Sequence, residues 1–248
     1  MVLPMSAGAP PTADLVTPRP RAYQVVLTWF EEQVLAGDLG VGDRLPAERE
    51  LAAQLGVGRA SVREAIRTLQ AQGVLHSAVG AGTTGGTTVR SGDPAALSRM
   101  LRLHVALGHF PLADVIEVRV ALELLSVRLA CANRTDEQLD RLQLLTDLMA
   151  QSLEDREAFN DSDTAFHVTV AEAAGNRLAT DTTAAIRESM RQPILDRFRT
   201  TASWERLAPR FLAEHRQILE AVRARDTAAA ERTMVGHVRE AWADLTRD

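Results

Sequence analysis

The 248-residue sequence has a single cysteine, Cys131, so it cannot form an internal disulfide framework, and we expect a cytoplasmic protein. It contains no stretch of about eighteen apolar residues, which argues against a membrane-spanning helix. Residues 1–20 have no apolar core of a secretory signal and are interpreted as a flexible, proline-rich tail. Lysine is also absent: all 28 basic residues are arginine, whose planar guanidinium favours bidentate contacts.

The net charge of −5 argues against a nucleic-acid partner only if it is spread evenly along the chain. Residues 1–92 contain 8 arginines and 8 acidic residues, whereas residues 93–248 contain 20 arginines and 25 acidic residues. The excess acidity therefore belongs to the second part. A hydrophobic content of 46% supports a sizeable core, and we expect two domains, residues 21–92 and 93–248.

The first domain changes element about every dozen residues. Its patterns predict helices over 22–37, 47–56 and 58–73, each ending at a glycine, and then a β-hairpin with a Gly/Thr-rich loop over 74–90. Two short helices joined by a tight turn and followed by a hairpin predict a winged helix-turn-helix.

The third predicted helix begins with "GRASVREAIR" and has two distinct faces. Its apolar residues face the core, while Arg59, Arg63 and Arg67 recur every four residues on the other face. Taken alone, this pattern is more typical of a solvated helix surface. As the second helix of a helix-turn-helix, it would place Arg59, Ser61 and Arg63 at DNA bases or phosphates.

The second domain is predicted to be an antiparallel all-α bundle, which makes the whole protein mainly α. We expect six or seven helices, at about 95–107, 111–132, 135–154, 156–174, 177–202, 205–224 and 227–246. The segment "TDEQ" at 135–138 predicts a capping box, and Pro193 predicts a kink in its helix.

Four residues of this bundle suggest a metal site. Asp163 and His167 are four apart on one helix face, and His215 and His237 lie on the last two helices. If they converge, one carboxylate and three imidazoles suit a divalent metal, zinc first, with nickel or manganese as alternatives. The alternative is an ordinary helix pair and two unrelated histidines.

Arg119 lies in the middle of a long apolar helix with Glu117 and Glu123 nearby. It is either part of an ion pair within the helix or a buried anion-binding group.

Taken together, these motifs resemble the GntR family of bacterial transcriptional regulators, in the branch whose C-terminal part is the helical FCD domain. The segment "GDRLPAERELAAQLGVGRASVREAIRTLQAQGVL" is similar to the family's winged-helix signature. The segments "EVRVALE", "DTAFH", "AAGN", "EHRQIL" and "GHV" follow the order and spacing of the FCD pattern. The long wing more weakly resembles that of lactate-responsive repressors.

The resemblance implies a homodimeric repressor, not an enzyme, that binds operator DNA and a small carboxylate effector such as L-lactate. It assigns DNA contacts to Arg49, Arg59, Ser61 and Arg63, metal binding to Asp163, His167, His215 and His237, and effector binding to Arg119 and Asn176. The sequence departs from the family pattern at two places that concern DNA binding. Gly58 replaces the usual Ser or Thr, so the recognition helix has no side-chain N-cap, and the wing has no common basic residue.

Two other functions remain open at this point. An Asp/His₃ metal site with an open position is also typical of a hydrolase that activates water. An FCD regulator without a metal would instead bind an acyl-type effector.

Overall fold

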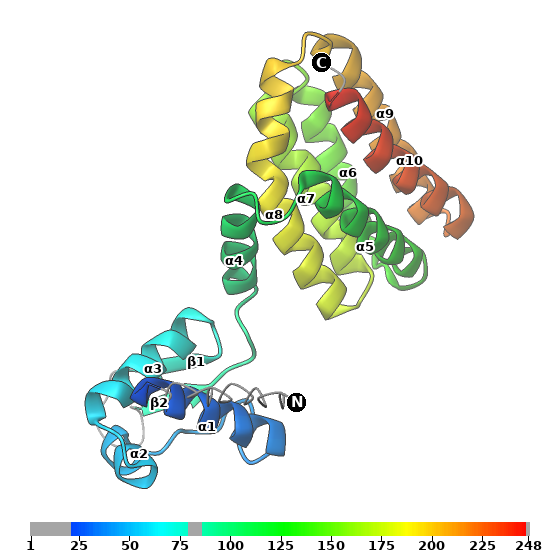
Figure 1. Cartoon of the computed structure of the whole chain (residues 1–248). Coiled ribbons are helices and arrows are strands. Elements are labelled where there is room, and N and C mark those ends of the chain that lie inside the picture. The colour runs from blue at the N-terminus through cyan, green and yellow to red at the C-terminus, as the bar shows by residue number, and fades with distance from the viewer. Residues whose placement is uncertain (1–20, 79–85, 247–248) are drawn as a thin grey trace, which may run out of the picture. The chain divides into compact units, whose positions relative to one another are not determined.

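The computed structural model describes residues 21–78 and 86–246 of the chain (Figure 1). The expected tail at 1–20 and most of the wing loop, 79–85, lie outside the described residues. The chain divides into two compact units, which we call the N-terminal unit (Met1–Ser91) and the C-terminal unit (Gly92–Asp248). None of the described helices is long and apolar enough to cross a membrane.

The N-terminal unit is a winged helix-turn-helix, as the sequence predicts. Its elements in chain order are α1 (Ala22–Ala36), α2 (Glu48–Leu55), α3 (Arg59–Ala71), β1 (Leu75–Ala78) and β2 (Gly86–Val89). The two strands pair antiparallel, with Leu75 opposite Val89. A small core joins the helices to the hairpin and includes Val26, Phe30, Leu51, Val62, Ile66 and Leu69.

The turn between α2 and α3 depends on two glycines. Gly56 ends α2 in the left-handed conformation, φ +64°, which glycine adopts without a steric penalty. Gly58 has the extended backbone of an N-cap but offers no side chain to the first amides of α3. The N-terminus of α3 is therefore positioned by its apolar face and not by a side-chain cap.

The C-terminal unit is a bundle of α-helices (Figure 1). They are α4 (Pro94–Ala106), α5 (Leu112–Asn133), α6 (Asp136–Gln151), α7 (Arg156–Ala173), α8 (Arg177–Thr200), α9 (Trp204–Arg223) and α10 (Thr227–Leu245). The capping box at Thr135 is confirmed, with Gln138 as its second member. Pro193 lies inside α8, which is assigned as one helix across it.

Helix α5 is at the centre of the bundle contacts. It packs against α7, α8, α9 and α10, whereas α4 packs mainly on α8. Side chains that point inward from α7, α9 and α10 are thereby brought to one buried region beside α5.

We predict that Gly58→Ser stabilises the start of α3. An N-cap serine accepts a hydrogen bond from a first-turn amide, and a Cβ at position 58 meets no atom within 4 Å. Relative to the matched variant Gly58→Ala, serine should stabilise the helix by about 1 kcal/mol. Hydrogen exchange of the α3 amides measures this as roughly fivefold slower exchange. Equal exchange in the two variants would contradict the N-cap assignment.

Candidate metal centre and nucleic-acid interface

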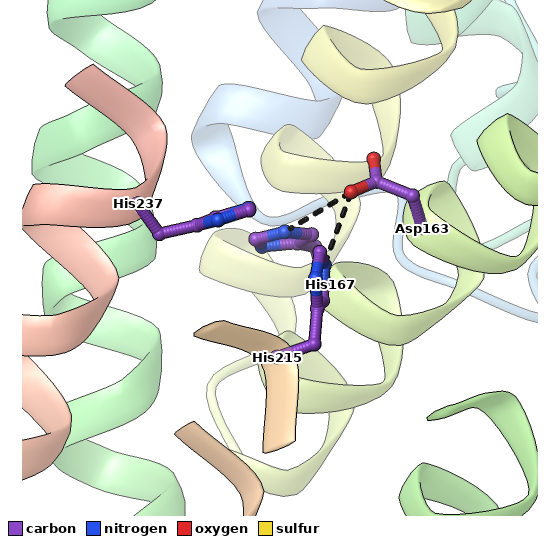
Figure 2. Close-up of side chains that lie close together, drawn as sticks. All are labelled: Asp163, His167, His215 and His237. Atoms are coloured by element: carbon purple, nitrogen blue, oxygen red, sulfur yellow. Dashed lines mark ion pairs between the residues drawn. The ribbon is translucent and has the colours of Figure 1, made fainter. Parts of the chain in front are cut away.

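The four residues proposed as metal ligands meet inside the C-terminal unit (Figure 2). Asp163 and His167 come from consecutive turns of α7, His215 from α9 and His237 from α10. All four are buried, and one donor atom from each lies within 4.8 Å of the others. The sequence alternative of unrelated histidines is therefore wrong, since the three imidazoles and the carboxylate form one cluster.

A fixed partner holds the Nδ1 atom of each imidazole. Nδ1 of His215 lies 2.7 Å from the Phe211 carbonyl oxygen, and Nδ1 of His237 lies 2.7 Å from Oε2 of Glu214. Nδ1 of His167 contacts Oε2 of Glu123. A backbone carbonyl only accepts hydrogen bonds, so Nδ1 of His215 is the protonated nitrogen. Partners of this kind are typical of metal-binding histidines, which coordinate through the other nitrogen.

The Nε2 atoms of His167 and His215 face the Asp163 carboxylate. Oδ1 of Asp163 lies 3.0 Å from Nε2 of His215 and 3.8 Å from Nε2 of His167. Among residues 21–78 and 86–246, both Nε2 atoms are buried without a hydrogen-bond partner. A lone pair on a neutral imidazole and a carboxylate oxygen repel each other unless a cation lies between them.

These distances fit one metal ion. Donor atoms bound to zinc at about 2.0–2.1 Å are at most about 4.2 Å apart, so the cluster needs only a small contraction. The residues present thus satisfy the donor chemistry of a divalent metal site.

The protonation states also suit a metal. Burial raises the pKa of Asp163, but the surrounding groups, Arg187 first among them, together outweigh burial and hold this pKa well below its usual range. Burial, together with His215, lowers the pKa of His237 well below the usual range. An ionised carboxylate and neutral imidazoles are the forms that bind divalent cations.

Arg187 of α8 is a buried residue of this site that the sequence analysis missed. Its Nη1 donates a 3.1 Å hydrogen bond to Oδ2 of Asp163, and its Nε lies 3.3 Å from Oε1 of Glu123. Burial and the nearby Arg119 lower the pKa of Arg187 to about 10, so it stays protonated at neutral pH. The one sequence signal that could have identified Arg187 is its position on a helix face whose other residues, such as Met190 and Ile194, are apolar.

Arg119 forms the ion pair within its helix, and its side chain also lines a cavity. Its Nε donates a 2.5 Å hydrogen bond to Oε1 of Glu123, the predicted pair within the helix. The same side chain also lines a cavity of about 20 Å³ with Asp163, His237 and Trp242. The rest of the cavity wall is apolar and consists of Ile194, Phe198, Phe211, Ala241 and Leu245. The cavity thus combines the Arg119 guanidinium, two of the four candidate metal ligands and an apolar wall.

The structure does not bring Asn176 to this cavity. Its side chain is exposed at the start of α8 and accepts a hydrogen bond from the amide of Ala179. Asn176 is therefore the N-cap of α8, and it is not among the residues that line the cavity.

The residues expected to contact DNA lie on α2 and α3. Arg49, Arg59 and Arg63 are exposed, and Ser61 is half-buried at the first turn of α3. Nε of Arg63 lies 3.3 Å from Oε2 of Glu48, which orients the guanidinium at the surface of the helix pair. This face of α3 presents cations opposite the apolar face that forms the core.

Comparison with known protein families finds a matching family model for each of the two units. Residues 22–84 match the family model described as bacterial regulatory proteins, gntR family, and residues 114–240 match the model of the FCD domain.

Two curated relatives are HTH-type transcriptional repressors called NanR. The protein from Klebsiella aerogenes is 31% identical over 229 residues, which cover 89% of this chain and 84% of the relative. The protein from Citrobacter rodentium is 30% identical over 236 residues, with the same coverage. The weaker resemblance to lactate-responsive repressors receives no support from these relatives.

Solved structures show the same fold. A GntR protein of Streptococcus agalactiae has a TM-score of 0.52 and 26% identity, covering 89% of this chain and 98% of that one. E. coli McbR/YncC has a TM-score of 0.50 and 22% identity, covering 91% and 97%, and supports the fold alone.

We predict that Arg187→Met destabilises the C-terminal unit by about 3–5 kcal/mol, because it leaves buried carboxylates without their cation. Arg191→Met is the matched control. Arg191 pairs with Asp161 between the same two helices, but both side chains are more than a third exposed. Loss of such an exposed pair costs about 0.2–1 kcal/mol.

Urea unfolding measures the difference in a Trp29→Phe background, where the remaining tryptophans, Trp204 and Trp242, both report the C-terminal unit. Equal destabilisation by the two substitutions would show that Arg187 is not the group that neutralises the buried carboxylates.

Proposed function

Because this chain belongs to the GntR family of bacterial regulators and carries its FCD domain, we propose that it is a homodimeric repressor controlled by a small carboxylate bound beside a divalent metal ion. The observation that carries the proposal is the buried Asp/His₃ cluster next to Arg119. In this proposal residues 21–92 bind operator DNA, and residues 93–248 bind the effector and dimerise.

DNA recognition is assigned to the exposed face of the helix-turn-helix. Helix α3 enters the major groove with its N-terminus first, so Arg59, Ser61 and Arg63 reach base edges or phosphates, and Arg49 contacts the backbone from α2. One such helix reads only a few base pairs. Two copies on half-sites about one helical turn apart supply the affinity that an operator requires.

The metal is assigned to Asp163, His167, His215 and His237. Three nitrogens and one carboxylate oxygen favour zinc, with nickel and manganese as alternatives. A bound divalent metal would act as a Lewis acid toward a carboxylate oxygen of the effector. Arg119 complements the remaining negative charge, since its guanidinium lines the same cavity.

Effector binding requires movement of the cavity wall. A volume of about 20 Å³ accommodates little more than one water molecule, for which about 10–15 Å³ suffices. A carboxylic acid therefore binds only a conformation in which aromatic side chains such as Trp242 or Phe198 have moved. The difference between the acid's binding free energies for the two conformations is the free energy available to change DNA binding.

The alternatives from the sequence are less well supported. The chain belongs to a family of regulators and not of enzymes, which disfavours a hydrolase. An acyl-type effector that binds without a metal would leave two acceptors, Oδ1 of Asp163 and Nε2 of His215, facing each other with no cation between them.

We predict that Arg63→Ala lowers affinity for the protein's own promoter DNA at least tenfold at fixed salt, because one good base contact contributes about 1–3 kcal/mol per half-site. Fluorescence anisotropy measures the affinity. The control is Arg177→Ala, an arginine whose side chain is 69% exposed in the C-terminal unit. Unchanged binding by Arg63→Ala, with the control also unchanged, would overturn the assignment of α3.

We also predict that the chelator-treated protein binds one zinc ion per chain and that His215→Ala loses this binding, as measured by calorimetry. The zinc-loaded protein should then release promoter DNA in response to one acid from a panel of small carboxylates that includes L-lactate. His104→Ala, outside the cluster, should behave as the unmodified protein. If His215→Ala still binds zinc, the metal site is wrong. If no acid of the panel changes the binding of promoter DNA by the zinc-loaded protein, the carboxylate effector is wrong.

A further inference from the structure

Helix α5 has an exposed apolar face that no other part of the described chain covers. Val118 is 52% exposed and Leu125 37%, and the exposed Ala121 lies between them. Spacings of three and four residues place the three side chains in one row along the helix. A continuous apolar row on the outside of a bundle is typical of an interaction surface.

Charged residues of opposite sign lie at the two ends of this row. Asp114 is seven residues before Ala121, and Arg128 is seven residues after it. Both are exposed, and a spacing of seven keeps them on the same face of the helix. Nε of Arg128 is bonded to Glu231, yet the side chain remains 55% exposed.

We propose that this face binds a second copy of the chain, with the two α5 helices antiparallel about a two-fold axis at Ala121. The axis places Asp114 opposite the partner's Arg128 and brings Val118 within one residue of the position opposite the partner's Leu125. Small alanine side chains meet at the centre, where the helices come closest. This inference rests on the proposed function, which requires a dimer, and specifies the surface that forms it.

Self-complementarity is the reason for choosing a second copy as the partner. A two-fold interface must match a patch to its own rotated image, which requires acid and base at equal distances on either side of the axis. The sequence around Ala121 has this arrangement. An unrelated helix would have no need of the symmetry.

The groove between α5 and α10 extends this surface. It is lined by Ala121 and Leu124 of α5 and, further along, by Val235, Gly236 and Arg239 of α10. Glycine inside a helix lowers its stability, and a Cβ at Gly236 would meet only Oε1 of Glu240, at 3.9 Å. No contact within the described chain requires this glycine, whereas the close approach of a partner helix does.

Cysteine cross-linking tests both the surface and its register. Two α5 helices in contact at alanine are about 8 Å apart, so Ala121→Cys on the axis forms a disulfide with the partner's copy. Val118→Cys alone should not, since its two copies are about 9 Å apart along the axis. A mixture of Val118→Cys and Leu125→Cys protein should form the mixed disulfide. The native Cys131 is buried, and burial raises the pKa of its thiol.

Leu178→Cys, at a 76% exposed position of α8, is the control for random collision. Cross-linking of Ala121→Cys without cross-linking of this control supports the proposal. Equal cross-linking of both overturns it. If light scattering finds the protein dimeric and Ala121→Cys does not cross-link, this surface is wrong and the dimer of the proposed function stands; a monomeric protein overturns both.

Charge insertion provides an independent readout. Val118→Arg and Ala121→Arg place like charges across the axis and should convert the dimer to a monomer at micromolar concentration, with unchanged circular dichroism. The matched control is Leu103→Arg on α4, which has an exposed apolar row of its own, with Met100 55%, Leu103 62% and Leu107 81% exposed. Dissociation by Leu103→Arg alone would move the interface to α4 and overturn the assignment of α5.

Discussion

The buried carboxylate of Asp163 is the constraint on which the C-terminal unit depends. An ionised carboxylate is costly to remove from water unless cations and donors surround it. Arg187 of α8 is such a cation, and Nε2 of His167 from α7 and Nε2 of His215 from α9 face the same carboxylate as acceptors that a bound cation would bridge. The helices of the bundle are therefore held in positions that an apolar core alone would not specify.

A second layer of polar groups fixes the first. Glu123 of α5 lies between two arginines and His167, and Glu214 of α9 holds His237 of α10. Each imidazole is thus oriented through Nδ1 before any ligand binds, with Nε2 directed to the centre. Such preorganisation reduces the reorganisation that binding of the proposed metal would need.

The sequence predicts local structure better than it predicts contacts. Helix positions follow from the 3.6-residue period, and the ends follow from caps such as Thr135 and Gly56, so the predicted and observed bounds agree within a few residues. The candidate ligand cluster could be predicted because Asp163 and His167 lie one turn apart on the same helix face. Arg187 and Glu214 were missed, since each acts on a residue 23 or 24 positions away. The expected role of Asn176 could not be separated from capping by sequence alone.

Trp242 lies between the cavity and the groove of the C-terminal unit and contributes to the lining of both. Its side chain lines the cavity beside His237 and also the groove between α5 and α10. Because the cavity is too small for a carboxylic acid, any ligand that displaces the indole alters the groove as well. If a second copy occupies that groove, the effector and the partner each bind best to a particular position of the Trp242 side chain. The two positions are either the same or different. Their binding is then coupled reciprocally, as linkage requires, without a longer chain of intermediates.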